Sequence, residues 1–178
     1  MPRGGWPGTG TSVVAAIEAV ATDPELPDRL VAVGHSAGGQ LAVWAASDGR
    51  CPALTGVVSL AGVLDLRLAD TDEVGSEAVR ALLGGAPEQS PQAWADADPT
   101  LGRLDVPAVL LHGAAGSHLV WPGPLRRLVG TRVLGLDLPG HGRSDPPGRR
   151  AIGHYAGTVT AFVEALGLRD VVIAGHSM

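Results

Sequence analysis

The chain of 178 residues is long enough for one domain with a buried core, and its 45% hydrophobic and 17% charged residues exclude a disordered protein. The net charge is −5, and the 13 basic residues are all arginines spread along the chain, so we expect no nucleic-acid partner. The single cysteine, Cys51, excludes an intrachain disulfide and a thiolate metal cluster.

No apolar run approaches the ~20 residues of a membrane-spanning helix, so we expect no membrane partner. The first residues, Met-Pro-Arg-Gly-Gly-Trp, lack the apolar core of a signal peptide. A cytoplasmic location is therefore the default expectation.

The elements predicted in chain order alternate between helices and short apolar strands. Residues 11–21 predict a helix that Thr11 or Ser12 would cap. Strands are predicted at 30–33, 56–61, 108–112, 132–137 and 171–174, a turn at 34–39, and helices at 40–46 and 155–166, with short helices within 62–105. Apolar strands without alternation, separated by helices, predict one α/β domain over residues 1–178, with about five mostly parallel strands covered on both faces.

An internal repeat links the two ends of the chain. Residues 17–20 match 163–166, and residues 30–37 match 171–178, so the unit helix, strand, Gly-His-Ser-x occurs twice. The two Gly-His-Ser strands compete for one central position in a sheet, and at least one of them should lie in an atypical place or be poorly packed.

Ser36 is the strongest candidate for a catalytic residue. It lies in Gly34-His-Ser-Ala-Gly38, after an apolar strand and before a helix, which is the context of a nucleophile elbow. The glycines two residues before and after the serine are expected because the turn crowds backbone against backbone. The Ala37 N–H would then lie at a helix N-terminus, where it could stabilise an oxyanion.

These motifs resemble the α/β-hydrolase superfamily. Residues 10–112 resemble the second half of a feruloyl-esterase-like or arylformamidase-like bacterial esterase, through the residues 34–39, 57–66 and 106–113. Residues 107–178 resemble the first half of the branch with non-haem haloperoxidases and carbon–carbon-bond hydrolases, through the residues 110–117, 136–145 and 175–178. The chain thus looks like a join of two hydrolase parts, 1–113 and 114–178, or a fragment.

The resemblance implies a triad that this sequence does not complete. Ala114 and Ala115 stand where the first family carries an acid, and Ala114 N–H is implied as a second oxyanion donor if strand 108–112 lies beside strand 30–33. Ser177 and Met178 form a truncated second elbow without a glycine at +2. Asp65 is a weak candidate for the acid and has the alternative role of a helix cap.

The histidines have ordinary structural interpretations. His35 and His176 are the variable residues of the two elbows, His112 belongs to the oxyanion motif, and His141 is expected to hold a loop by hydrogen bonds. His118 and His154 are expected to be surface or capping residues. The triad acid and base are therefore unassigned.

Two functions from different classes remain open. The first is a serine hydrolase acting on small carboxylic esters through Ser36, and the second is a hydrolase-like chain that lacks its triad acid and base. A nucleotide-binding domain has little support because the glycine turns carry Ser and His rather than a phosphate cradle. No cofactor and no metal are predicted, and a homodimer remains open.

Overall fold

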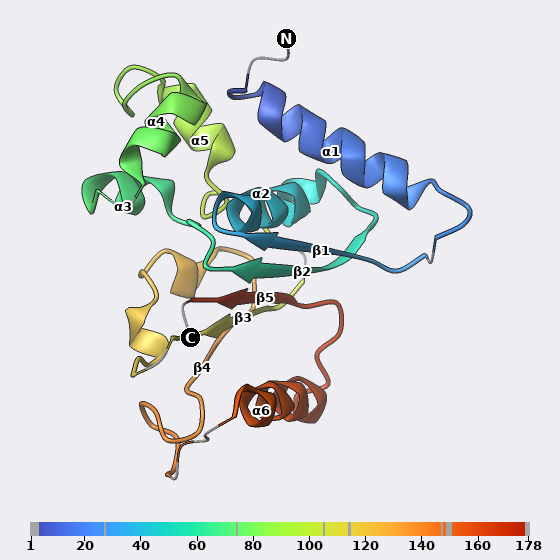
Figure 1. The fold of residues 1–178 in the computed structure, drawn as a ribbon, viewed down its shortest axis with the longest axis vertical. Helices are drawn as coiled ribbons and strands as arrows, with labels where there is room; N and C mark the ends of the chain where they lie inside the picture. Colours follow the sequence, from blue (N-terminus) through green and yellow to red (C-terminus); the bar gives the residue numbers. More distant parts are fainter. Residues whose placement is uncertain are drawn as a thin grey trace.

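The computed structural model describes residues 4–26, 28–73, 75–104, 106–113, 115–146, 148 and 151–176. Five strands form one parallel sheet in the order β1-β2-β5-β3-β4 (Figure 1). The strands are β1 (Leu30–His35), β2 (Leu54–Leu60), β3 (Ala108–Leu111), β4 (Val133–Leu136) and β5 (Val172–Gly175). The sequence-based prediction of about five parallel strands is confirmed, with each strand within two residues of its expected bounds.

Helices cover the sheet from both sides. On one side α2 (Ala37–Ala46) packs on β1 and β2, and α1 (Gly8–Ala21) packs on α2. On the other side lies α6 (Ile152–Ala165), near the β3–β4 half of the sheet (Figure 1). Three short helices and three 3-10 turns complete the chain: α3 (Leu66–Thr71), α4 (Ser76–Leu83), α5 (Pro91–Ala97), Ser47–Gly49, His118–Val120 and Leu125–Arg127.

The main core lies between the sheet and α2. Val57, Leu110 and Val172 point to this side and are at most 2% exposed, and Ala42 and Val43 of α2 pack against them. Successive residues of a strand point to opposite faces, so their neighbours in sequence point toward α6. The α2 face is therefore the better buried of the two.

The start of the first helix differs from expectation. The helix begins at Gly8 rather than after Thr11 or Ser12, and neither residue caps it. Their hydroxyls instead donate to the carbonyl oxygens of Pro7 and Gly8, one turn earlier in the helix. This back-bonding satisfies the hydroxyls inside a helix, so a Ser or Thr does not by itself fix a helix start.

The competition between the two repeated strands has a definite outcome. β5, the second copy, lies between β2 and β3, whereas β1, the first copy, is the outer strand. The prediction that one copy would lie in an atypical place is thus confirmed. The expectation that every strand is covered on both faces is wrong for β1. Val31 and Val33 point to the α6 side of the sheet and are 50% and 65% exposed, because α6 does not extend over β1.

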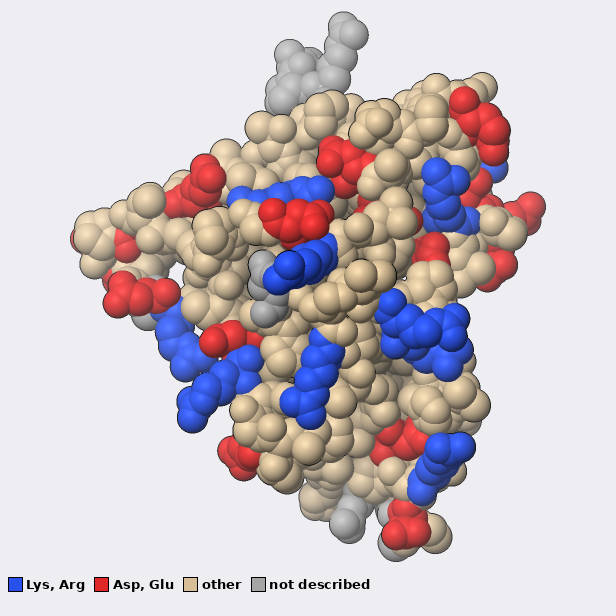
Figure 2. Space-filling model, turned by 180° about the vertical axis from the view of Figure 1, so that it is seen from behind, with Lys and Arg blue, Asp and Glu red and all other residues tan. Residues whose placement is uncertain are grey.

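Acidic and basic side chains are mixed on the face of the molecule that Figure 2 shows. Arginine side chains in Figure 2 are separated by acidic and uncharged surface, and neither sign covers the face shown. Among the helices that the structure describes, none is both long and apolar enough to cross a membrane. The described His, Cys, Asp and Glu side chains form no group of three that could hold a metal ion.

Candidate active site

The carboxyl ends of all five strands meet at one edge of the sheet, because every neighbouring pair is parallel. Ligands of open parallel sheets bind outside this edge. Ser36 follows β1 there, the Ala61–Gly62 segment follows β2, and His176 follows β5. His112 and Asp137 follow β3 and β4.

Ser36 has the backbone of a sharp strand-to-helix turn. Its φ and ψ are 53° and −122°, a conformation that side chains other than glycine rarely adopt. Its N–H donates to the Leu60 carbonyl oxygen at 2.9 Å, and its own carbonyl oxygen accepts from Gln40 N–H at 3.1 Å. The residue is exposed, and its hydroxyl has no hydrogen-bond partner among the described residues. The turn therefore presents an accessible hydroxyl.

The glycines around Ser36 differ in what they do. A Cβ on Gly34 would overlap the Gly38 carbonyl and lie 2.6 Å from the Gly39 nitrogen. A Cβ on Gly39 would lie 2.6 Å from the Ser59 hydroxyl. Gly38 is different, because a Cβ there meets nothing within 4 Å. The expectation of backbone crowding holds for Gly34 and is wrong for Gly38.

Ala37 is the first residue of α2, directly after Ser36. The first N–H groups of a helix have no partner inside the helix, and they carry its positive partial charge. Ala37 N–H is thus available beside the Ser36 hydroxyl. This geometry matches the oxyanion donor that the sequence predicts.

The strand pairing on which the second oxyanion donor depended is not formed. β3 does not lie beside β1, since β2 and β5 stand between them. Three interstrand spacings of ~4.8 Å separate the two strands, which is too far for a shared oxyanion site. Ala114 itself lies outside the described residues.

The second elbow is only partly visible. Ser177 and Met178 lie outside the described residues, so their predicted roles stay predictions. Gly175 is the counterpart of Gly34, and a Cβ on it would meet nothing within 4 Å of the described chain.

Asp65 acts as a helix cap. It is the N-cap of α3, and its carboxylate accepts from Leu68 N–H at 2.9 Å. The role of a helix cap, the expected alternative to a triad acid, is therefore present in the structure. A second carboxylate, Asp98, is 3% exposed, and burial raises its pKa while hydrogen bonds from Thr100 oppose this rise. No sequence motif marks Asp98.

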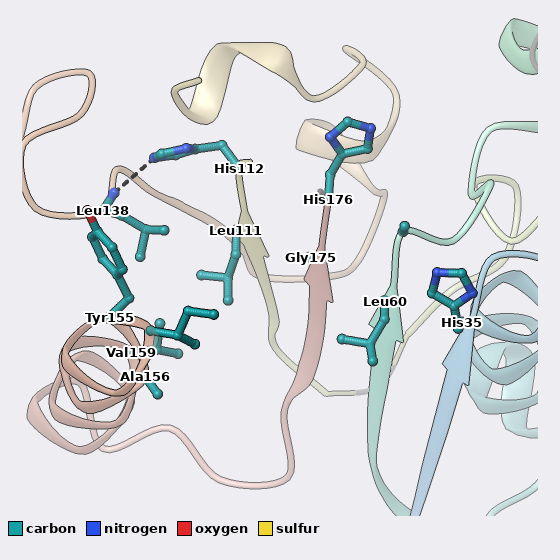
Figure 3. A pocket seen from close by; sticks show the side chains of 12 residues that line it. His35, Leu60, Leu111, His112, Leu138, Tyr155, Ala156, Val159, Gly175 and His176 are labelled. Carbon is teal, nitrogen blue, oxygen red and sulfur yellow. Dashed lines mark hydrogen bonds between the residues drawn. The ribbon is translucent and has the colours of Figure 1, made fainter. Parts of the chain in front are cut away.

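His112 is a structural histidine. Its Nε2 accepts from Leu138 N–H at 3.0 Å (the dashed line in Figure 3), and its Nδ1 lies 2.7 Å from the Gly113 carbonyl oxygen. An Nε2 that accepts carries no proton, so the proton is on Nδ1 and is donated to Gly113. Both nitrogens are occupied, and the residue is 1% exposed.

His118 differs from its prediction as a surface or capping residue. Its Nδ1 lies 2.9 Å from Asp137 Oδ2, and its backbone N–H donates to Asp137 Oδ1 at 2.6 Å. Burial raises the pKa of Asp137, but the N–H groups of Arg143 and His118 and the His118 ring outweigh it, so the pKa falls to about 2. This pair orders the loop after β4. His141 Nδ1 also contacts that loop, 3.1 Å from the Pro139 carbonyl oxygen, as expected.

Two cavities meet at the carboxyl ends of the central strands. The larger, about 560 Å³, lies between α6 and the strand ends and is mostly apolar (Figure 3). The smaller, about 280 Å³, is bounded by the segment 61–65, by α3 and by Trp121. Ala61 and His176 line both cavities.

Comparison with known proteins gives two family matches. Residues 106–178 match the model of the alpha/beta hydrolase fold, and residues 11–124 match the model of the prolyl oligopeptidase family. A non-heme haloperoxidase from Rhodococcus erythropolis is 45% identical over 74 residues, 40% of this chain and 27% of that protein. A non-heme chloroperoxidase from Streptomyces lividans is 41% identical over 81 residues, 42% of this chain and 28% of that protein.

Among solved structures, the fold is similar to an inhibited esterase B from Lactobacillus rhamnosis. The TM-score is 0.51 at 13% identity, and the match covers 99% of this chain and 52% of the esterase. This chain therefore spans about half of the esterase and just over a quarter of the curated relatives. The expected resemblance to haloperoxidases is confirmed. The family model that matches the second part is that of the alpha/beta hydrolase fold, and the model that matches the first part is that of the prolyl oligopeptidase family.

Proposed function

Because the chain belongs to the α/β-hydrolase superfamily, and over residues 11–124 to its prolyl oligopeptidase family, we propose that it is a serine hydrolase that cleaves small carboxylic esters with Ser36 as nucleophile. The observation that carries this proposal is the strained backbone conformation of Ser36. A serine held at φ 53° between a strand and a helix is strained, and such strain gathers at functional sites.

The surroundings of Ser36 support nucleophilic attack. The hydroxyl is exposed at the sheet edge, and Ala37 N–H lies at the start of α2. A donor in that place stabilises the negative charge that develops on a carbonyl oxygen under attack. One such donor is typically worth ~3 kcal/mol in the transition state.

Turnover should nevertheless be low. No base is bonded to the Ser36 hydroxyl in the described chain, and Asp65 is occupied as a cap. Hydrolases that lose triad members keep ~10³–10⁴-fold acceleration over water from binding and the oxyanion hole. We expect at least this acceleration on activated esters.

The test compares three proteins on p-nitrophenyl acetate: the unaltered chain, Ser36→Ala and Ser177→Ala. The proposal expects slow hydrolysis that Ser36→Ala removes and Ser177→Ala retains. The pair is matched, because both serines follow Gly-His in the sequence. Hydrolysis that is unchanged in Ser36→Ala, or absent from all three folded proteins, would favour the second function, a hydrolase-like chain without catalysis.

A further inference from the structure

Three of the six histidines are unsuited to serve Ser36 as a base. His112 has both nitrogens occupied, and His118 is bound to Asp137. His141 contacts Pro139 in the loop after β4. β4 is the edge strand opposite β1, so His118 and His141 lie at the far side of the sheet from Ser36.

Two more histidines lie on the α6 side of the sheet. His35 directly precedes Ser36, and it lines the larger cavity on the α6 side together with Val159 (Figure 3). His154 is exposed in the first turn of α6, on that same side. α2, which continues from Ser36, covers the opposite face of the sheet. His35 and His154 therefore both lie on the α6 side, and His35 is the direct chain neighbour of Ser36 at the end of β1.

His176 remains, and the sheet places it near Ser36. Its backbone N–H donates to the Leu111 carbonyl oxygen at 3.1 Å, which fixes it at the end of the central strand β5. Only β2 separates β5 from β1. Two backbone hydrogen bonds connect the three strand ends. Ser36 N–H donates to the Leu60 carbonyl oxygen at 2.9 Å, and Ala61 N–H donates to the Gly175 carbonyl oxygen at 2.6 Å.

The spacing suits a proton transfer. Two interstrand spacings of ~4.8 Å put the two backbones roughly 10 Å apart. A serine and a histidine side chain directed toward each other, with bonds of ~1.5 Å, together span about 7 Å, so a rotation of both toward Ala61 would leave about 3 Å for a hydrogen bond. Ala61 lies between them and presents only a methyl group. No large side chain of β2 therefore blocks the path at this level.

His176 lies beside an aromatic ring and opens into the smaller cavity. Its ring meets the edge of Trp121, with centroids 6.5 Å apart, on the side of the sheet where Trp121 joins the α2 core. Asp65 and Asp72 line the same smaller cavity.

We propose that His176 is the general base of Ser36, an inference that rests on the proposed function. His176 takes the Ser36 hydroxyl proton while the oxygen bonds to the ester carbonyl carbon and the carbonyl π electrons move to its oxygen. When the tetrahedral intermediate collapses, the bond to the alcohol oxygen breaks, and His176 returns the proton to that oxygen. Water then hydrolyses the acyl enzyme by the same proton path, which regenerates the Ser36 hydroxyl.

The experiment measures kcat/KM for p-nitrophenyl acetate against pH in the unaltered chain, His176→Gly and His154→Ala. His154 lies outside both cavities and is exposed, so it is the matched control. We expect His176→Gly to lose about 10²-fold and to lose the rise of kcat/KM across the histidine range, while His154→Ala keeps both. Imidazole added to His176→Gly should restore at least about 10-fold, which a merely structural role would not allow.

The other titratable groups that face His176 are His35, His112 and Tyr155 in the larger cavity and Asp65 and Asp72 in the smaller one. If the pH-dependent rise persists in His176→Gly and imidazole has no effect, one of these groups is responsible and the inference is wrong. The proposed function would still stand if Ser36→Ala abolishes hydrolysis. If Ser36→Ala has no effect, the proposed function fails, and the role of His176 fails with it.

Discussion

Gly34 faces the Gly38 carbonyl so closely that no Cβ fits at position 34, whereas a Cβ at position 38 meets open space. The two glycines are symmetric around Ser36 in the sequence, but only the first is required by packing. The turn at Ser36 is therefore fixed from its strand side.

This asymmetry predicts opposite effects of two alanine substitutions. Gly34→Ala should destabilise the protein by at least ~3 kcal/mol, because backbone atoms must move to admit the methyl group. Gly38→Ala should stabilise it by ~0.5–1 kcal/mol, since alanine is the better helix former at the start of α2. Urea unfolding of both variants measures the difference, and equal destabilisation would contradict the geometry of the turn.

The uncovered face of β1 predicts where a hydroxyl is tolerated. Val33 is 65% exposed, and Val57, on the neighbouring strand, is 1% exposed. Val33→Thr should change the free energy of unfolding by less than ~0.5 kcal/mol, whereas Val57→Thr should cost ~1–3 kcal/mol for a buried hydroxyl without a partner. Thermal unfolding of the two variants checks this, and a large loss in Val33→Thr would mean that something covers β1 in solution.

Asp137 predicts a loss of stability in acid. Its pKa is lowered to about 2, below its ordinary value near ~3.9, so its contribution is present above pH ~4 and is lost as pH falls through ~2. At ~1.4 kcal/mol per pKa unit the contribution is on the order of 2 kcal/mol. Asp137→Asn should remove it and flatten the dependence of stability on pH between ~4 and ~2.

Asp145→Asn is the matched control for this prediction, because Asp145 is in the same loop and exposed. It should leave the dependence of stability on pH unchanged. A dependence in Asp137→Asn as steep as that of the unaltered chain would show that the contacts from His118 and Arg143 do not favour the ionised form of Asp137.

Cys51 predicts a thiol that reacts slowly in the folded protein. Burial raises its pKa, Glu18 adds to the rise, and Arg50 opposes it. The residue is 4% exposed, so both thiolate formation and access are suppressed. Alkylation by iodoacetamide at pH 8 should be slow in the native chain and fast in guanidinium chloride. Equal rates in both conditions would place Cys51 at the surface.

The sequence predicts the strands well because each is a short apolar run between turn residues. The order of the strands is not predictable in the same way. The strands at 30–35 and 172–175 have nearly the same sequence pattern. A local pattern therefore holds no information on which of the two strands pairs with β3. That choice depends on long-range pairing, and it is why β3 does not lie beside β1, the condition on which a second oxyanion donor at Ala114 depended.

In the candidate site, too, local features are predictable from the sequence and long-range contacts are not. The strained turn at Ser36 is predictable, because Gly34 and the flanking strand and helix are contiguous in the sequence. The pairing of His118 with Asp137 joins residues 19 positions apart across a loop, and no short motif signals it. The approach of His176 to Ser36 depends on the strand order alone.

The most direct test of the account is to identify the serine that a fluorophosphonate modifies. The folded chain is labelled, digested and mapped by mass spectrometry, with Ser36→Ala treated in parallel. The account predicts one phosphonylated peptide that contains Ser36, formed as the serine oxygen bonds to phosphorus and fluoride leaves, and no adduct in Ser36→Ala. An adduct on the peptide that contains Ser177, or no adduct on the folded chain, would contradict it.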